Sequence, residues 1–349
     1  AHDYAEALHL TTYFYGAQRC GDTQSWIHGP CHVKDGQSVS LDLTGGWHDC
    51  GDHVLFGQTA PYAAGVLLEG YINFPARYED RYSQAYSAPP PNGIPDILDE
   101  AKIMTDWLIK AVRPDRFYYQ KGDGDNDHKY FIEPQYYSEN YDVSDGGERN
   151  GPRPVQHRTS GGSNVAGNMA AALALMAIAY EPYDSAYADL CFAKAKQVYA
   201  IGDTSRGTVS ANPFYEAANW ADDMAWGAIS IYRASVQRGS PENTYLTAAQ
   251  GFFNHSDFQN AGYWPLCYDH TEPLAAYALW KVTGNNIYVN YMQTEFNYYN
   301  GLMTSCSGGE YAHVTNWGSL RFSGNMAFGA MLYYDMTGSA AALEFTKKI

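Results

Sequence analysis

Helical periodicity of apolar residues runs through most of this 349-residue chain and constrains its fold more than any other feature. One clear example has apolar residues recurring at spacings of three and four, which mark one face of a helix: Ile94, Ile97, Leu98, Ala101, Met104 and Leu108. A further helix is predicted to open at Asp3, where Glu6 completes a capping box. Similar patterns lie near 56–73, 163–180, 184–200, 222–238, 241–254, 271–283, 287–301, 319–337 and 339–349. The sequence therefore predicts an all-α protein of about eleven helices with little strand.

Two joints between predicted helices have the same form, Val282-Thr283-Gly284-Asn285 and Met336-Thr337-Gly338-Ser339. In each, a glycine ends one helix and a polar residue caps the next, which predicts repeated helical hairpins. Long polar loops rich in Gly, Asp, Tyr and Trp separate other helices, at 21–46, 113–160, 201–221 and 302–318. Loops of this length tend to carry function. No break in composition marks a boundary, so we expect one domain over 1–349.

The composition excludes several classes of partner. The chain carries 22 basic and 38 acidic residues, a net charge of −16, which argues against nucleic acid and anionic membranes. No stretch approaches the roughly 20 apolar residues of a membrane span. Aromatic residues make up 15% of the chain, and rings that are not packed in the core suit stacking on sugars. The chain opens with Ala rather than Met, which is typical of a processed mature protein.

The densest motif is the segment Leu43-Thr44-Gly45-Gly46-Trp47-His48-Asp49-Cys50-Gly51-Asp52-His53. Two carboxylates lie three residues apart in a turn where glycine permits tight geometry. One interpretation is that Asp49 and Asp52 only cap a helix that begins near Val54. A pair of carboxylates flanked by glycines, Trp and two His favours instead an acid–base catalytic site.

This motif resembles that of glycoside hydrolase family 9, D-L-x-G-G-W-Y-D-A-G-D-x-x-K-F. Asp42, Leu43, Gly45, Gly46, Trp47, Asp49, Gly51, Asp52 and Phe56 match, whereas His48, Cys50 and Leu55 replace the common Tyr, Ala and Lys. The segment 118–128 resembles the family's Y-Y-Q-V-G-D-G…D-H, and 316–322 resembles its N-W-G-S-L-R-Y. The resemblance implies an (α/α)6 barrel of twelve helices and a secreted, monomeric endo-β-1,4-glucanase (cellulase) that acts by inversion.

The resemblance also implies roles for single residues. Asp52 matches the general base that activates water, and Asp49 matches the carboxylate that helps to hold it. His128 matches a glucose-contacting His, and Tyr130 and Phe131 stand where many members have two Trp. Trp264, Trp317 and Arg321 match sugar-binding positions along the cleft, although each Trp could also be ordinary core.

The acid partner of the family is absent from the printed sequence. The resemblance places it on a Glu near the C-terminus, in an N-E-V motif that follows a His-His-Arg segment, and neither occurs here. The residues Phe345-Thr346-Lys347-Lys348-Ile349 resemble the start of the family's F-A-K-K-Q-I-D-Y-I-L-G. We therefore expect the last barrel helix and the acid Glu beyond residue 349. A catalytically dead carbohydrate-binding protein is the alternative function.

Two further groups of residues are candidate metal sites. Cys20, Cys31, His32 and His48 offer two thiols and two imidazoles, the ligand set of a closed structural zinc site, and some family members carry zinc with this ligand order. The alternative is a Cys20–Cys31 disulfide. Asp222, Asp223 and Asp269 resemble the family's calcium site, which is completed by backbone carbonyls here near Ala218 and Asn219. The alternative is that Asp222 and Asp223 cap a helix that begins at Met224.

Overall fold

The computed structural model describes residues 3–23, 27–81 and 91–349. Its long helices are α1 (Tyr4–Gln18), α2 (Ala60–Asn73), α3 (Asp96–Ala111), α6 (Ser163–Tyr180), α7 (Ser185–Gly202), α8 (Ala221–Gln237), α9 (Asn243–Phe253), α11 (Glu272–Thr283), α12 (Asn286–Gly301), α13 (Ser319–Thr337) and α14 (Ala340–Lys348). Short helices are α4 (Gly124–Asp127), α5 (Pro134–Asn140) and α10 (Ser256–Gln259). The predicted helices are thus confirmed over the described residues.

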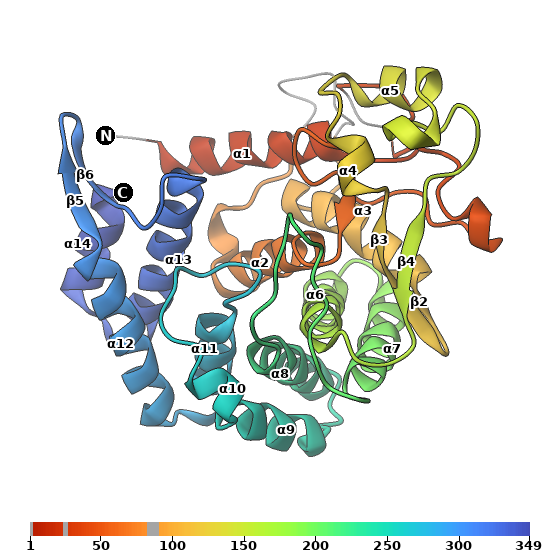
Figure 1. Cartoon of the computed structure of the whole chain (residues 1–349). Coiled ribbons are helices and arrows are strands. Elements are labelled where there is room, and N and C mark those ends of the chain that lie inside the picture. The colour runs from red at the N-terminus through yellow and green to blue at the C-terminus, as the bar shows by residue number, and fades with distance from the viewer. Residues whose placement is uncertain (1–2, 24–26, 82–90) are drawn as a thin grey trace.

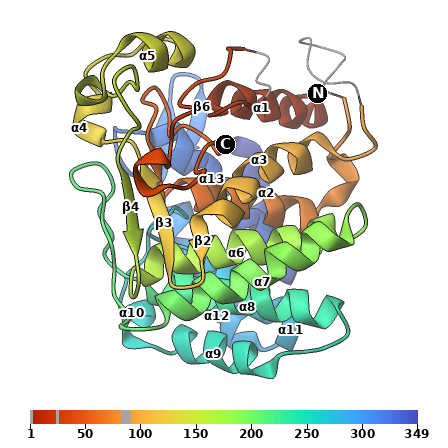
Figure 2. The same cartoon turned by 90° about the vertical axis from the view of Figure 1, so that its right-hand side faces the viewer.

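The long helices after α1 form consecutive antiparallel hairpins, α2–α3, α6–α7, α8–α9, α11–α12 and α13–α14. The first helix of each hairpin also packs against that of the next, so α2, α6, α8, α11 and α13 form an inner layer. The second helices lie outside them, and α1 runs between the α13 and α3 ends of the arc (Figure 1). This is the α/α-barrel architecture, and Figure 2 shows the layers from the side.

Small residues let the inner helices approach closely. A Cβ at Gly167 of α6 would lie 2.4 Å from the backbone of Asp223 in α8, which no real side chain tolerates. Contrary to the expectation from the sequence, helix α6 is long and apolar enough to cross a membrane by length and hydropathy. However, 94% of it is buried within the protein, as in a core helix. The two predicted Thr-Gly joints are confirmed, with Gly284 and Gly338 at φ +66° and +69°.

Strands were under-predicted. Four short antiparallel strands, β1 (Leu55–Phe56), β2 (Val112–Arg113), β3 (Arg116–Lys121) and β4 (Val155–Arg158), form a small sheet with β3 paired to all three others. A hairpin, β5 (Met303–Cys306) and β6 (Gly309–Ala312), lies near α13 and α14. The predicted loop 113–160 therefore contains strands as well as α4 and α5. Because β1 pairs with β3, the 43–53 segment is held next to residues 121–128.

Candidate active site

The turn that carries Asp49 and Asp52 is closed by its own backbone. The amide of Asp49 donates to the carbonyl of Val54 at 2.8 Å, and the amide of His48 donates to Gln18 at the end of α1 at 2.7 Å. The chain then enters β1, and helix α2 begins only at Ala60. Neither aspartate caps that helix, so the capping interpretation is wrong.

Asp49 is the more accessible of the two carboxylates and lines a small pocket together with Phe14, Tyr15 and Thr59. Its Oδ1 accepts a hydrogen bond from Thr59 Oγ1 at 2.5 Å, and its Oδ2 accepts one from the hydroxyl of Tyr215. Burial, with the charge of Asp52 adding to it, raises the pKa of Asp49. The hydroxyl groups of Thr59 and Tyr215 fix the orientation of this side chain.

Asp52 is buried, with 1% of its side chain exposed, and its two oxygens face different surroundings. Oδ1 accepts the backbone amide of Val54 at 3.0 Å. Oδ2 accepts the thiol of Cys50 at 2.9 Å and lies 3.5 Å from His128 Nε2. Cys50 is exposed and His128 is 31% exposed, so both groups that Oδ2 contacts are open to solvent.

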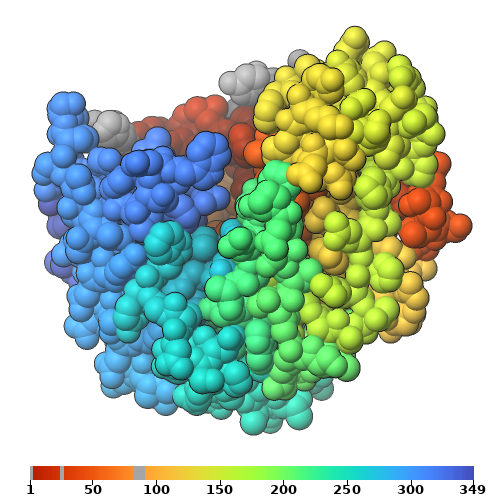
Figure 3. Space-filling view, viewed as in Figure 1, coloured from red at the N-terminus to blue at the C-terminus, as the bar shows by residue number. Residues whose placement is uncertain are grey.

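The aromatic residues predicted to bind sugar are all exposed, so the core interpretation of Trp264 and Trp317 is wrong. Tyr130, Phe131, Trp264 and Trp317 are 42%, 68%, 40% and 87% exposed. His128 stacks on Phe214, with centroids 4.5 Å apart, and meets Phe131 edge-on at 6.2 Å. Figure 3 shows a depression between the yellow segment that holds α4 and the blue helix α13, with red N-terminal residues at its floor.

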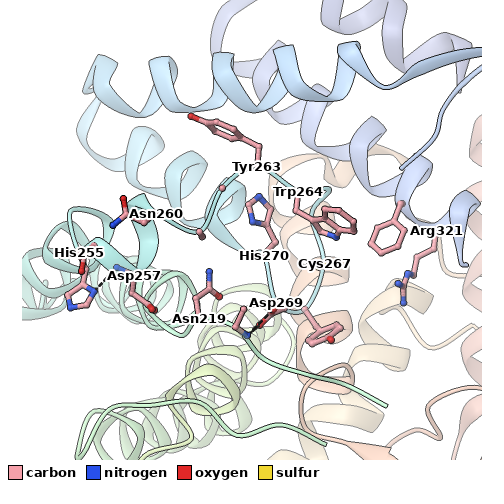
Figure 4. Close-up of a pocket in the computed structure, with 16 residues that line it drawn as sticks. Asn219, His255, Asp257, Asn260, Tyr263, Trp264, Cys267, Asp269, His270 and Arg321 are labelled. Atoms are coloured by element: carbon pink, nitrogen blue, oxygen red, sulfur yellow. Dashed lines mark hydrogen bonds between the residues drawn. The ribbon is translucent and has the colours of Figure 1, made fainter. Parts of the chain in front are cut away.

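Trp264 and Arg321 lie in one pocket of about 870 Å³, whereas Trp317 is not part of its lining. The indole of Trp264 packs edge-on against Phe322, with centroids 5.8 Å apart, and the Arg321 guanidinium lies 4.4 Å from the same ring. Figure 4 shows Trp264 and Arg321 together at one side of this pocket and Asn219 and Asp269 at another. The pocket therefore joins two of the predicted sugar-binding residues to three of the candidate calcium residues, Ala218, Asn219 and Asp269.

The four candidate zinc ligands converge, although they come from separate segments. All are buried, and their ligand atoms lie within 4.8 Å of one another. The Cys31 Sγ–His48 Nε2 and Cys20 Sγ–His32 Nδ1 distances are 3.6 and 3.9 Å. Tetrahedral zinc with its usual bond lengths needs S–N separations of roughly 3.6 Å. All six cysteines are free, so Cys20 and Cys31 are not joined as the disulfide interpretation required.

The charges around these ligands also suit a divalent cation. Lys121 and Arg153 are buried cations, and the buried carboxylates Asp35 and Asp127 balance them. Two thiolates would then need two more positive charges. Burial disfavours ionisation of Cys20, but its hydrogen bond with Cys31 and the Lys121 ammonium outweigh burial and hold the pKa of Cys20 well below its ordinary value. Burial lowers the pKa of His32 to about 4, which keeps this imidazole neutral and able to bind a metal.

The candidate calcium residues fit a cation less closely. Asp222 and Asp223 are fully buried, and Asp222 Oδ1, Asp223 Oδ2 and Asn219 Oδ1 have no hydrogen-bond partner. Burial and neighbouring carboxylates raise the pKa of both aspartates well above the ordinary value. Unlike the zinc set, however, the carboxylates of Asp222, Asp223 and Asp269 do not all lie within 4.8 Å of one another.

The structure differs from the sequence-based predictions for the capping of helix α8 and for the contact between Asp269 and Ala218. Helix α8 begins at Ala221 and has no side-chain cap, so the capping interpretation of Asp222 and Asp223 is wrong. Asp257 receives the amides of Trp220 and Ala221 instead. Asp269 accepts the amide of Ala218 at 3.0 Å, so this contact uses the nitrogen of Ala218, whereas a ligand would use its carbonyl.

Several residues at the site could not be found from the sequence. Thr59 and Tyr215 hold Asp49, and Phe214 stacks on His128, but each has an unremarkable sequence context. Tyr215 lies in the 201–221 loop, whose length was its only signal. Cys50 was noticed as a departure from the motif, and its hydrogen bond to Asp52 emerges only from the structure.

An α/α barrel that presents paired aspartates beside exposed aromatic rings belongs to the class of carbohydrate-active helical barrels. Comparison with known proteins identifies the family. The family model described as "Glycosyl hydrolase family 9" matches residues 4–349, so the chain belongs to glycosyl hydrolase family 9.

Individual relatives agree with this assignment. The chain is 33% identical to Endoglucanase B of Cellulomonas fimi and 31% identical to Endoglucanase A of Bacillus pumilus, in each case over 96% of its own length. It spans 32% and 50% of those two proteins. A crystal structure of the cellulase Cel9M of C. cellulolyticum in complex with cellobiose superposes with a TM-score of 0.84 at 31% identity, covering 100% of this chain and 77% of that one. The (α/α)6 barrel expected from the resemblance is thereby confirmed.

Proposed function

We propose that this chain is the catalytic part of an endo-β-1,4-glucanase that hydrolyses cellulose-type glucans with inversion of configuration. The observation that carries the proposal is the closed turn 49–54, which presents two carboxylates beside exposed aromatic rings. The names of the relatives, endoglucanases and a cellulase with cellobiose, support this substrate class.

In the proposed mechanism Asp52 is the general base. Its Oδ2, which lies beside Cys50 and His128, would take the proton of the attacking water, while Val54 holds Oδ1. Asp49, fixed by Thr59 and Tyr215, would help to hold that water. Inverting enzymes keep acid and base about 6.5–9.5 Å apart so that water fits between base and sugar. The acid is proposed to be a Glu outside the printed sequence.

The exposed rings and Arg321 would hold the glucan chain. Flat aromatic faces suit the apolar faces of glucose units, and the 870 Å³ pocket with Trp264 and Arg321 is large enough for a sugar unit. We propose that His128, Tyr130 and Phe131 contact the sugars beside the cleavage point and that Trp264, Trp317 and Arg321 contact the chain further along. We further propose a secreted monomer.

Incubating the full-length gene product with soluble carboxymethyl cellulose is expected to release reducing ends and to lower the viscosity rapidly. Endo-cleavage produces few ends for a large fall in chain length, so the ratio of the two readouts identifies it. Proton NMR of cello-oligosaccharide products should show the α-anomer first, because single displacement inverts the β-linkage. Binding without release of reducing ends would favour the carbohydrate-binding alternative instead.

We propose that the structural zinc is held by Cys20, Cys31, His32 and His48, and that calcium is held near Asp222, Asp223 and Asp269 with backbone oxygens at Ala218 and Asn219. Four protein ligands leave zinc no open position, which assigns it a structural role. The partnerless oxygens of Asp222, Asp223 and Asn219 support the calcium proposal.

Adding calcium to chelator-treated protein is expected to raise its melting temperature. A ligand at about 100 times its Kd stabilises a fold by about 2.7 kcal/mol. At roughly 2 °C per kcal/mol for a chain of this length, the shift is about 5 °C. Magnesium is the control, because it demands a tighter octahedral site. The Asp223→Asn variant should lose the calcium-dependent shift, and an equal response of that variant would exclude this site.

A further inference from the structure

The peptide groups on either side of His53 are held by two buried side chains outside the turn. Asp127 Oδ1 accepts the amide of His53 at 2.9 Å, and this amide belongs to the peptide that joins Asp52 to His53. Arg153 Nη1 donates to the carbonyl of His53 at 2.7 Å, which belongs to the next peptide. Both peptides that follow Asp52 are therefore fixed from outside.

The second of these peptides also holds the Asp52 carboxylate. Its amide is that of Val54, which donates to Asp52 Oδ1 at 3.0 Å. A guanidinium on the carbonyl of a peptide polarises that peptide and strengthens the hydrogen bond donated by its amide. Arg153 and Asp52 thus hydrogen-bond to opposite ends of the same peptide group, so the charge of Arg153 polarises the peptide that holds the Asp52 carboxylate.

Arg153 and Asp127 are themselves rigidly placed. They form a buried ion pair at 3.3 Å, with exposures of 1% and 0%, and a second carboxylate, Asp35, receives Arg153 Nη2 at 2.8 Å. Gly122 leaves room for this ion pair, because a Cβ at position 122 would lie only 3.2 Å from Arg153 Nη1 and 3.3 Å from Asp127 Oδ2. Its φ of +87° also favours glycine.

We propose that Asp127 and Arg153 are positioning residues that set the orientation of the Asp52 carboxylate and, through it, the rate of the chemical step. The inference rests on the proposed function, in which Asp52 is the general base. Neither side chain needs to touch the sugar. Misplacement of a reacting group by about 1 Å can cost about a hundredfold in rate, so a small rotation of this peptide is sufficient.

The test compares Asp127→Asn with Glu69→Gln in the full-length protein. Asparagine keeps an oxygen for the His53 amide but turns a donor toward Arg153. Glu69 is also a buried carboxylate paired with an arginine, Arg233 at 2.6 Å, and none of its partners belongs to the turn. Asp127→Asn is expected to lower kcat about ten- to hundredfold on soluble β-1,4-glucan, with KM and cello-oligosaccharide affinity unchanged. Glu69→Gln is expected to lower the melting temperature while leaving kcat unchanged.

The possible outcomes distinguish the positioning role from the proposed function. If the wild type is active, two results would overturn the positioning role. One is an unchanged kcat in Asp127→Asn, and the other is a loss of kcat in Glu69→Gln equal to that in Asp127→Asn. An inactive wild type would instead contradict the proposed function. If Asp127→Asn does not fold, Arg153→Lys decides, because lysine keeps the charge but cannot bond His53, Asp127 and Asp35 through one planar fork. A lower kcat at unchanged KM supports the proposal, and an unchanged kcat overturns it.

Discussion

Replacing Asp52 with alanine in the full-length gene product is expected to lower kcat on β-1,4-glucan by roughly 10³–10⁴-fold, near the upper end of what a general base contributes. Water is a weak nucleophile, and without a base its proton has no acceptor as the bond to the sugar forms. The carboxylate lies beside the exposed rings but is itself buried, so its loss should barely affect sugar binding. The measurement is kcat from reducing ends together with cello-oligosaccharide affinity from calorimetry.

Asp49→Ala is the matched control, because it removes the other carboxylate of the same turn. Asp49 accepts hydrogen bonds on both oxygens, from Thr59 and Tyr215, and in our proposal it only helps to hold the water. We expect a smaller loss of kcat than for Asp52→Ala. Asp49 is also the more accessible of the two. If Asp49→Ala were the more damaging substitution, the roles of the two aspartates would be exchanged.

The sequence predicted the helices well for two reasons. Helices such as α3 carry apolar residues at helical spacing, and the buried α6 is too long an apolar run for a strand. It under-predicted the strands, since β1 has two residues and β3 reads as part of a long polar loop. Yet β3 is the element that brings residues 121–128 to the turn that carries Asp49 and Asp52. Short strands owe their pairing to distant partners, and local propensity does not contain that information.

As with the fold, part of the candidate site could be predicted from the sequence and part could not. The grouping of Asp49 with Asp52 and the convergence of the four candidate zinc residues could be predicted, because these residues lie in or shortly before one dense motif that resembles a known family. Asp127 and Arg153 could not be assigned a role, because their contacts span 74 and 100 residues along the chain. The alternatives from helix capping failed because each assumed a wrong helix start. Helix α2 begins at Ala60, after β1, and helix α8 begins at Ala221, before Asp222.

Replacing Cys20 with serine is expected to abolish zinc binding and to destabilise the fold. Wild-type protein should contain one zinc per chain by metal analysis. The variant removes a thiolate that lies 3.5 Å from the Lys121 ammonium and 4.0 Å from the Arg153 guanidinium. Breaking a buried charge network by removing one partner costs about 3–5 kcal/mol, which at roughly 2 °C per kcal/mol lowers the melting temperature by about 6–10 °C.

Cys191→Ser is the control for burying a hydroxyl in place of a thiol, since Cys191 is fully buried and belongs to neither metal-ligand cluster of the described residues. It should keep the zinc and lose less stability. The Cys20 variant should also lose activity, because His48 is both a proposed ligand and the residue before Asp49 in the turn that we propose to be catalytic. A wild-type protein free of zinc after purification in zinc-containing buffer, or a Cys20→Ser variant with full zinc content, would contradict this assignment.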